Sequence, residues 1–169
     1  MHPAIRYTLG IATVAQVTVA PLTASGQAAG PSACTLIDAA EWVRLTGKKD
    51  VLGRGPLLSP SDESPPNTSV CSFLSISVAV RPNMTAERFA RIRQGSDPKV
   101  WKTESISGLG DEAYYLWDSR PGGSSRSVVI NYRSGSTDVG IEHVVPPDSI
   151  AATKRMLLGI AKSTASKVR

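Results

Sequence analysis

Apolar and polar positions alternate through most of the second half of the chain, which is the spacing of β-strands. The clearest case is the segment 138–145, where valine, isoleucine and His143 fall on a common face. Glycine, proline and serine bound each such segment. The pattern predicts strands over 100–106, 113–117, 127–133 and 138–145, and connections this short make neighbouring strands antiparallel.

The segment 70–80 alternates in the same way and predicts one further strand. Its apolar face holds Leu74, Ile76 and the valines that follow, while Cys71 falls on the opposite face. Any helix that is bonded to Cys71 must therefore reach this strand at its edge or through a bulge.

Helical spacing occurs in three places. Thr35 is expected to cap a helix of about twelve residues that Gly47 ends. A short helix follows Asn83 or Thr85, and a terminal helix runs from Pro146 through about residue 164. The expected apolar faces are Leu36, Ala40 and Val43; Phe89, Ala90 and Ile92; and Ile150, Thr153, Leu157 and Ile160.

The element order is therefore α-β-α-β-β-β-β-α. A single antiparallel sheet of about five strands with helices packed on one face is the economical way to bury these apolar surfaces. The expected fold class is α+β.

Residues 1–28 have the features of a secretory signal peptide. Arg6 precedes the apolar run 7–22, and small residues follow up to Ala28. The run contains a glutamine and is shorter than the roughly twenty residues of a spanning helix, so a retained membrane span is the weaker alternative. We expect an exported protein, periplasmic or secreted, with one domain over 29–169 and no stable membrane span after processing.

The chain has two cysteines, Cys34 and Cys71. In an oxidising compartment they are expected to form a disulfide with each other. A catalytic thiol or a metal site needs a partner histidine, and beyond the signal the sequence offers only His143. The sequence therefore predicts a structural bond, with no metal, cofactor or catalytic residue.

The segment 47–69 is rich in proline and glycine and has no usable period, which predicts a long loop containing Arg54. Two interpretations stay open. The loop is either a poorly ordered insertion whose fraying the disulfide limits, or a presented binding loop.

The charge balance is mildly basic, with 19 Lys and Arg against 14 Asp and Glu. The basic residues alternate with acids and few aromatic residues accompany them, so nucleic-acid binding is not expected. Weak attraction to an acidic surface is compatible with this balance.

Several short motifs suggest chemistry that their context does not favour. The letters of Gly108–Ala113 match a dinucleotide fingerprint, but a strand pattern follows where that site needs a helix. Asp111 and Glu112 are adjacent, so in a strand they point to opposite faces, and in a loop they are a weak calcium set. A tight glycine turn and a core or half-buried His143 are the expected alternatives.

Three tryptophans, Trp42, Trp101 and Trp117, either line a ligand pocket or belong to the core, and the core is the commoner place.

Three short patterns resemble a group of small exported bacterial proteins and lipoproteins of unknown function. They are Ala33-Cys34-Thr35-Leu36-Ile37, then Val70-Cys71-Ser72-Phe73, then Ile106-Ser107-Gly108-Leu109-Gly110-Asp111-Glu112-Ala113-Tyr114. The resemblance covers about residues 33–163 and implies the PsbP-like and LpqN-like α+β fold and a non-enzymatic accessory role. The chain lacks the lipobox of the lipoproteins, which puts membrane anchoring in doubt.

The leading functional expectation is a binding module that engages a protein or an envelope component. Its contact surfaces would be the loop 47–69 with Arg54 and the turn from Asp118 to Arg126 with Arg120. The alternative is a carrier for a small apolar ligand, with a pocket between sheet and helices lined by the tryptophans. Neither the identity of the partner nor the oligomeric state follows from the sequence.

Overall fold

A six-stranded antiparallel sheet in the order β1-β2-β6-β5-β4-β3 forms the centre of the protein. A computed structural model describes residues 32–37, 39–47, 68–73 and 76–168. The strands are β1 (Ser69–Phe73), β2 (Ile76–Arg81), β3 (Trp101–Ile106), β4 (Glu112–Asp118), β5 (Arg126–Ser134) and β6 (Thr137–Val145). The helices are α1 (Ala33–Leu36), α2 (Ala39–Thr46), α3 (Ala86–Gln94), the 3-10 turn η2 (Pro147–Ser149) and α4 (Ile150–Ala165). The α+β class is confirmed.

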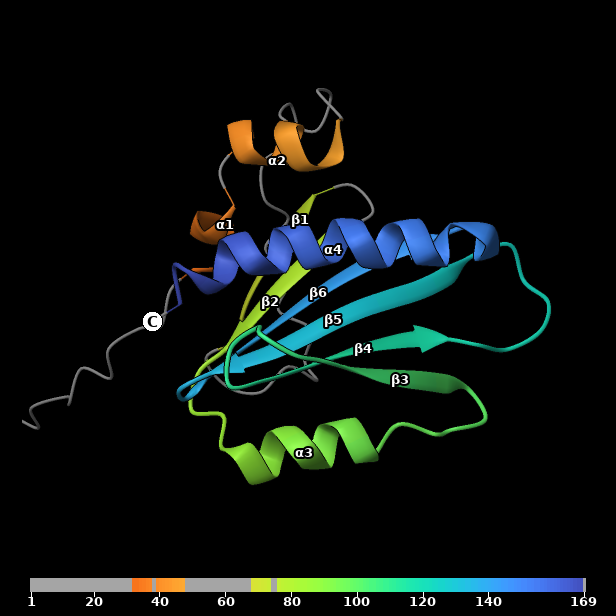
Figure 1. Ribbon diagram of the computed structural model, residues 1–169, viewed down its shortest axis with the longest axis horizontal. Helices are drawn as coiled ribbons and strands as arrows, with labels where there is room; N and C mark the ends of the chain where they lie inside the picture. Colours follow the sequence, from red (N-terminus) through yellow and green to blue (C-terminus); the bar gives the residue numbers. More distant parts are fainter. Residues whose placement is uncertain (1–31, 38, 48–67, 74–75, 169) are drawn as a thin grey trace, which may run out of the picture.

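The long C-terminal helix α4 packs across one face of the sheet (Figure 1). The odd-numbered positions of β6 and the even-numbered positions of β5 face it, because side chains alternate along each strand. The buried contacts of this layer include Val128, Ile130, Ile141, Leu157 and Ile160, all 0% exposed. Each such side chain contributes roughly 1.5–3 kcal/mol relative to an exposed one.

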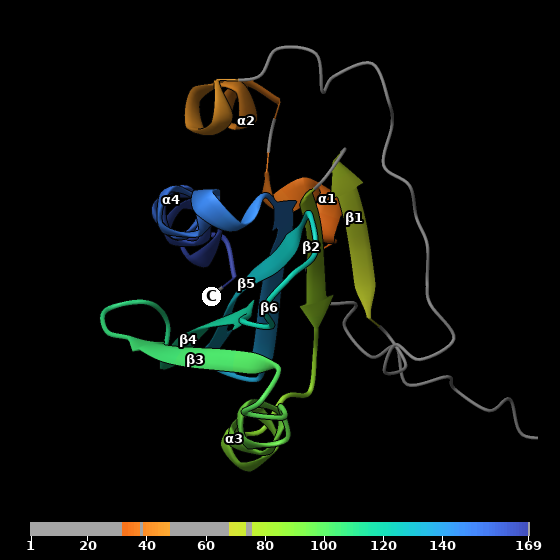
Figure 2. The same cartoon turned by 90° about the vertical axis from the view of Figure 1, so that its right-hand side faces the viewer.

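The helix α3 lies on the opposite side of the sheet (Figures 1 and 2). Phe89 of α3 meets Tyr114 with 5.2 Å between ring centroids, whereas the neighbouring Tyr115 donates a hydrogen bond to the Lys154 carbonyl of α4. The expectation of helices on one face thus holds for α4 but not for α3. The Thr85 side chain caps α3 as expected, yet Ile92, placed on its apolar side, is 39% exposed.

The segment 70–80 is a hairpin of two strands, and the prediction of one continuous strand is wrong. Cys71 pairs with Val78 in this hairpin, so the two lie side by side on the buried face. In a single strand Cys71 and Ile76 would face opposite sides. Because the chain reverses between them, Cys71 lies on the same face as Ile76 and Val80, and no bulge is needed.

The predicted first helix is also divided, into α1 and α2. Thr35 does not cap it: its hydroxyl donates to the Ser32 carbonyl at 2.8 Å, inside α1. Gly47 ends α2 as predicted, with φ +69° and its amide bonded to the Val43 carbonyl. The break lets α1 reach the sheet edge while α2 lies over α4 (Figure 2).

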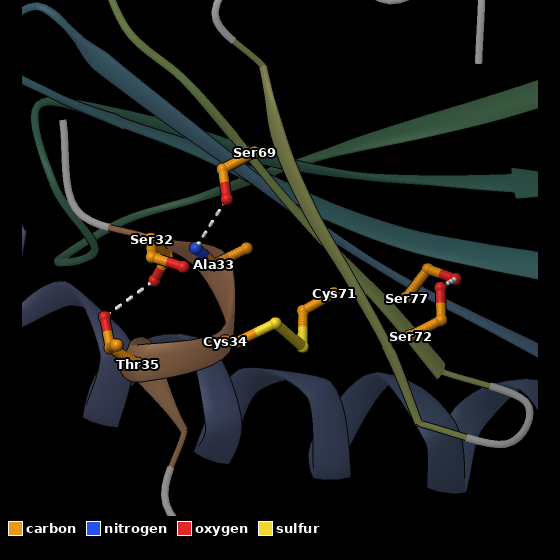
Figure 3. The surroundings of a disulfide bond; sticks show 8 residues. All are labelled: Ser32, Ala33, Cys34, Thr35, Ser69, Cys71, Ser72 and Ser77. Atoms are coloured by element: carbon orange, nitrogen blue, oxygen red, sulfur yellow. Dashed lines mark hydrogen bonds between the residues drawn. A yellow bond between two sulfur atoms is a disulfide. The ribbon is translucent and has the colours of Figure 1, made fainter. Parts of the chain in front are cut away.

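The disulfide between Cys34 and Cys71 is confirmed, and it fastens α1 to β1 (Figure 3). The Ala33 amide adds a hydrogen bond of 3.0 Å to the Ser69 hydroxyl. At the other end of the chain, the Lys167 ammonium donates to the Leu36 carbonyl at 2.7 Å. Both ends of the described chain are therefore tied to the same corner.

A buried ion pair lies on the α3 side of the sheet. Asp138 is 0% exposed, and its Oδ2 lies 2.6 Å from the Arg81 Nε, but neither carboxylate oxygen accepts a well-formed hydrogen bond from the described residues. Arg81 also donates to Asn131 at 3.1 Å. Gly140 leaves room for both, since a Cβ there would come within 2.8 Å of the Asn131 oxygen and 3.1 Å of the Arg81 guanidinium.

The expected signal 1–28, the loop positions 48–67 and Arg54 lie outside the described residues. Within the described ranges, no helix has the length and apolar character needed to cross a membrane.

We expect the Cys34→Ser, Cys71→Ser double variant to lose about 2–4 kcal/mol of unfolding free energy, because the bond closes a loop over a sequence separation of 37. Urea unfolding of the oxidised wild type, the reduced wild type and the variant measures this loss. The reduced protein is the matched control and should fall with the variant. Equal midpoints for all three would contradict the prediction.

The pKa of Asp138 gives a pH dependence of stability. Burial outweighs the attraction of Arg81 and raises this pKa from 3.8 to about 6. The folded protein therefore holds the proton more tightly than the unfolded chain, and this stabilisation is lost as pH rises from about 4 to about 6. We expect a loss of roughly 3 kcal/mol over that interval in wild type and much less in Asp138→Asn. The exposed Asp148→Asn variant should keep the wild-type profile, and identical profiles for all three proteins would contradict this assignment.

Candidate partner-binding site

The connection between β4 and β5 is an exposed loop that its own ends brace. We name residues 118–126 the Asp118–Arg126 loop; its positions 120–125 are all exposed. Gly122 and Gly123 adopt φ of +77° and +83°, a region that favours glycine, so this part of the sequence encodes the reversal directly. The predicted turn is therefore present as an ordered surface feature.

Asp118 braces the first half of this loop. Its carboxylate accepts hydrogen bonds from the Arg120 backbone amide at 3.0 Å and from the Arg120 guanidinium at 2.7 Å. These bonds to Arg120 lower the pKa of Asp118 from 3.8 to about 2. The Arg120 side chain remains 60% exposed, although its Nε and Nη2 donate to the Asp118 carboxylate.

Arg126 braces the second half of this loop. It is 8% exposed, and its guanidinium donates to the carbonyls of Arg120 at 2.6 Å and Ser125 at 3.0 Å. A Cβ at Gly123 would come within 3.1 Å of the same guanidinium. Sequence reasoning named the turn but missed this role of Arg126. A charged residue three positions after the Gly-Gly reversal is the only signal in the sequence that pointed to it.

The Asp118–Arg126 loop is joined to the connection between α3 and β3. The Ser119 amide donates to the Val100 carbonyl at 2.8 Å. Trp101 pairs with Asp118 across β3 and β4, so this half-buried tryptophan lies beside the base of the loop. Of the candidate contact residues, the structure thus brings Trp101 and Arg120 to one end of the molecule.

Trp117, a further candidate, lies on the other face of the sheet. Trp117 is next to Asp118 in β4 and so faces the opposite side of the sheet, where the Lys154 ammonium lies 3.4 Å from its ring centroid. Trp42 belongs to α2, with its side chain outside the described part, as is Arg54.

Within the described residues, the tryptophans expected to line a pocket between sheet and helix do not come together. Trp101 and Trp117 face opposite sides, and the α4 layer is filled by side chains that are fully buried. A depression of about 200 Å³ lies at the other end of the sheet, between the 108–110 turn and the end of α4. Pockets for drug-sized ligands measure roughly 300–1,000 Å³.

The glycine motif is a turn fastened to the β5–β6 hairpin. Gly110 has φ +58°, and a Cβ there would collide with the Arg133 carbonyl, which accepts from the Asp111 amide at 2.8 Å. β4 follows, where a dinucleotide site needs a helix. Asp111 and Glu112 both bind the Arg133 guanidinium, and no cluster of metal-ligand residues occurs in the ranges that the structure describes.

His143 lies on the α4 face of β6 and is 8% exposed. The prediction of a core or half-buried histidine is confirmed.

The chain matches no family model, and no curated protein matches it. The surface geometry therefore carries the functional argument.

We expect loss of the Asp118 brace to free the loop without unfolding the sheet. In Asp118→Ala, the Arg120 amide should exchange with solvent at least about tenfold faster, because it loses a hydrogen bond to a charged acceptor. In the wild type the brace should weaken as pH falls from about 4 to about 2, as the depressed pKa of Asp118 dictates.

Amide exchange followed by NMR and corrected for the intrinsic rate checks both effects. Asp97→Ala is the matched control, because Asp97 makes the same type of bond to the Lys99 amide and its loss should affect that amide instead. An unchanged Arg120 amide in Asp118→Ala would refute the brace.

Proposed function

We propose that this chain is an exported, non-enzymatic binding domain that engages a protein or an envelope component through the Asp118–Arg126 loop. The observation that carries the proposal is the two-sided brace on an exposed loop. Asp118 and Arg126 are almost fully buried, yet both form hydrogen bonds to Arg120, a residue that is exposed to solvent.

The brace favours binding because it removes part of the entropic cost of association. Ordering a mobile loop at an interface consumes binding free energy, and a loop that is already ordered avoids that cost. The rigid sheet below the loop adds to this effect, since Asp118 is the last residue of β4 and Arg126 is the first residue of the adjacent strand β5.

The charge of the chain favours an acidic partner. The formal net charge is +5, and the loop presents the Arg120 side chain, which is 60% exposed. Arginine is well suited to recognise carboxylates and phosphates because its planar group donates several hydrogen bonds in a fixed geometry.

Export is supported by the disulfide, because such bonds persist mainly in oxidising compartments. The α+β fold also agrees with the resemblance to the PsbP-like and LpqN-like domains, and we propose that the chain shares their accessory, non-enzymatic role.

We expect Arg120→Glu to reduce binding of the oxidised, full-length protein to the envelope fraction of its own source at least about tenfold, because it replaces an exposed cation in the loop with an anion. Arg155→Glu is the matched control. It makes the same charge change at an exposed position of α4 and should bind like wild type.

Binding is measured by immobilising each variant and quantifying the retained protein and lipid. Equal retention by Arg120→Glu and wild type would rule out the loop as the contact surface, and equal losses in both variants would reduce the effect to net charge alone.

A further inference from the structure

The strand β3 is an edge of the sheet, and its free hydrogen-bonding groups can be assigned. The Ser119 amide donates to the Val100 carbonyl, so residues 100 and 119 form a hydrogen-bonded pair. Such pairs alternate with non-hydrogen-bonded ones along antiparallel strands. The register then directs the backbone groups of Lys102, Glu104 and Ile106 toward β4, and those of Trp101, Thr103 and Ser105 outward.

This edge is open in the described structure. Residues 102–105 are all exposed, and β3 ends the strand order with no described segment paired to its outer side (Figures 1 and 2). The Trp101 amide donates to the Asp97 carbonyl at 2.8 Å, so the outward groups without a described partner are the Trp101 carbonyl and the amides and carbonyls of Thr103 and Ser105. These five groups form a template for a further strand.

The sequence of β3 is complementary to itself when two copies run antiparallel. With a two-fold axis at Thr103, Thr103 lies opposite its own copy, and Trp101 lies opposite Ser105 of the second copy. In this register the Thr103 amide can donate to the Thr103 carbonyl of the second copy, and the Ser105 amide to the Trp101 carbonyl of the second copy, each twice by symmetry.

The same register brings opposite charges together. Lys102 lies opposite Glu104 of the second copy, twice by symmetry, in the non-hydrogen-bonded pairs where side chains approach most closely. Lys102 is exposed and makes no ion pair with the residues that the structure describes. Glu104 binds Lys154 at 2.8 Å, but its side chain is 57% exposed and retains room for a second cation.

We propose that two copies of this chain associate through β3 in this register, which forms one continuous sheet of twelve strands from the two six-stranded sheets. The β3 edge begins at Trp101, beside the base of the Asp118–Arg126 loop, but it uses backbone groups of β3 and not the exposed side chains of the loop. The proposal does not depend on the proposed function.

Charge exchange tests the register directly. We expect Lys102→Glu and Glu104→Lys each to weaken self-association about tenfold or more, because each places like charges opposite one another twice. An equimolar mixture of the two variants should form a heterodimer, since each strand then complements the other. Lys99→Glu, an exposed charge change outside β3, is the matched control and should associate like wild type.

Sedimentation over a wide range of protein concentration, together with native mass spectrometry of the mixture, measures these effects. A wild type that stays monomeric throughout, or a mixture that forms no heterodimer while the wild type dimerises, would overturn the proposal.

A backbone variant gives a second test. Thr103→Pro removes an outward N–H that takes no part in the β3–β4 pairing, so the monomer should fold while dimerisation is lost. In the wild type, dimerisation should slow amide exchange at Thr103 and Ser105. It should not slow exchange at Lys102 or Glu104, which already bond to β4, or at Trp101, which already bonds to the Asp97 carbonyl. Protection of all five amides alike, or of none, would contradict the assigned register.

Discussion

The packing of α4 against β5 and β6 is the interaction on which the rest of the structure depends. It buries the apolar positions of the central strands and fixes which side of every other strand faces inward, because pairing transmits the alternation from strand to strand. The second face is left free for polar groups. Arg81, Asn131 and Asp138 occupy it, and α3 covers part of it through Phe89.

Local sequence patterns predicted those elements that are bounded by recognisable turn or cap residues. The β5–β6 hairpin follows from the turn at Gly135, and α3 follows from Thr85 and Gly95. The hairpin of β1 and β2 was not predicted, because apolar and polar residues keep alternating from one strand to the next. No glycine or proline lies between Phe73 and Ile76 to indicate a turn. A period of two carries no sign of a change in strand direction.

The sequence predicted where the candidate site lies, but not which hydrogen bonds hold its loop in place. Glycines and proline located the turn, and the exposed Arg120 was among the expected contacts. The role of Arg126 depends on bonds from a buried side chain to backbone carbonyls, and no spacing rule reports such bonds. The separation of Trp101 from Trp117 was likewise hidden until the register between β3 and β4 showed that they face opposite sides.

The absence of a side chain at Gly140 restricts which substitutions this part of the sheet can accept. Its missing side chain is the space in which the Asn131 oxygen and the Arg81 guanidinium meet, and Arg81 in turn faces the carboxylate of Asp138. The effect of replacing any one of these four residues is therefore set by the other three, so their substitutions are expected to be strongly non-additive. Homologous chains that change this corner should change it as a unit, with a larger residue at 140 accompanied by smaller or uncharged partners.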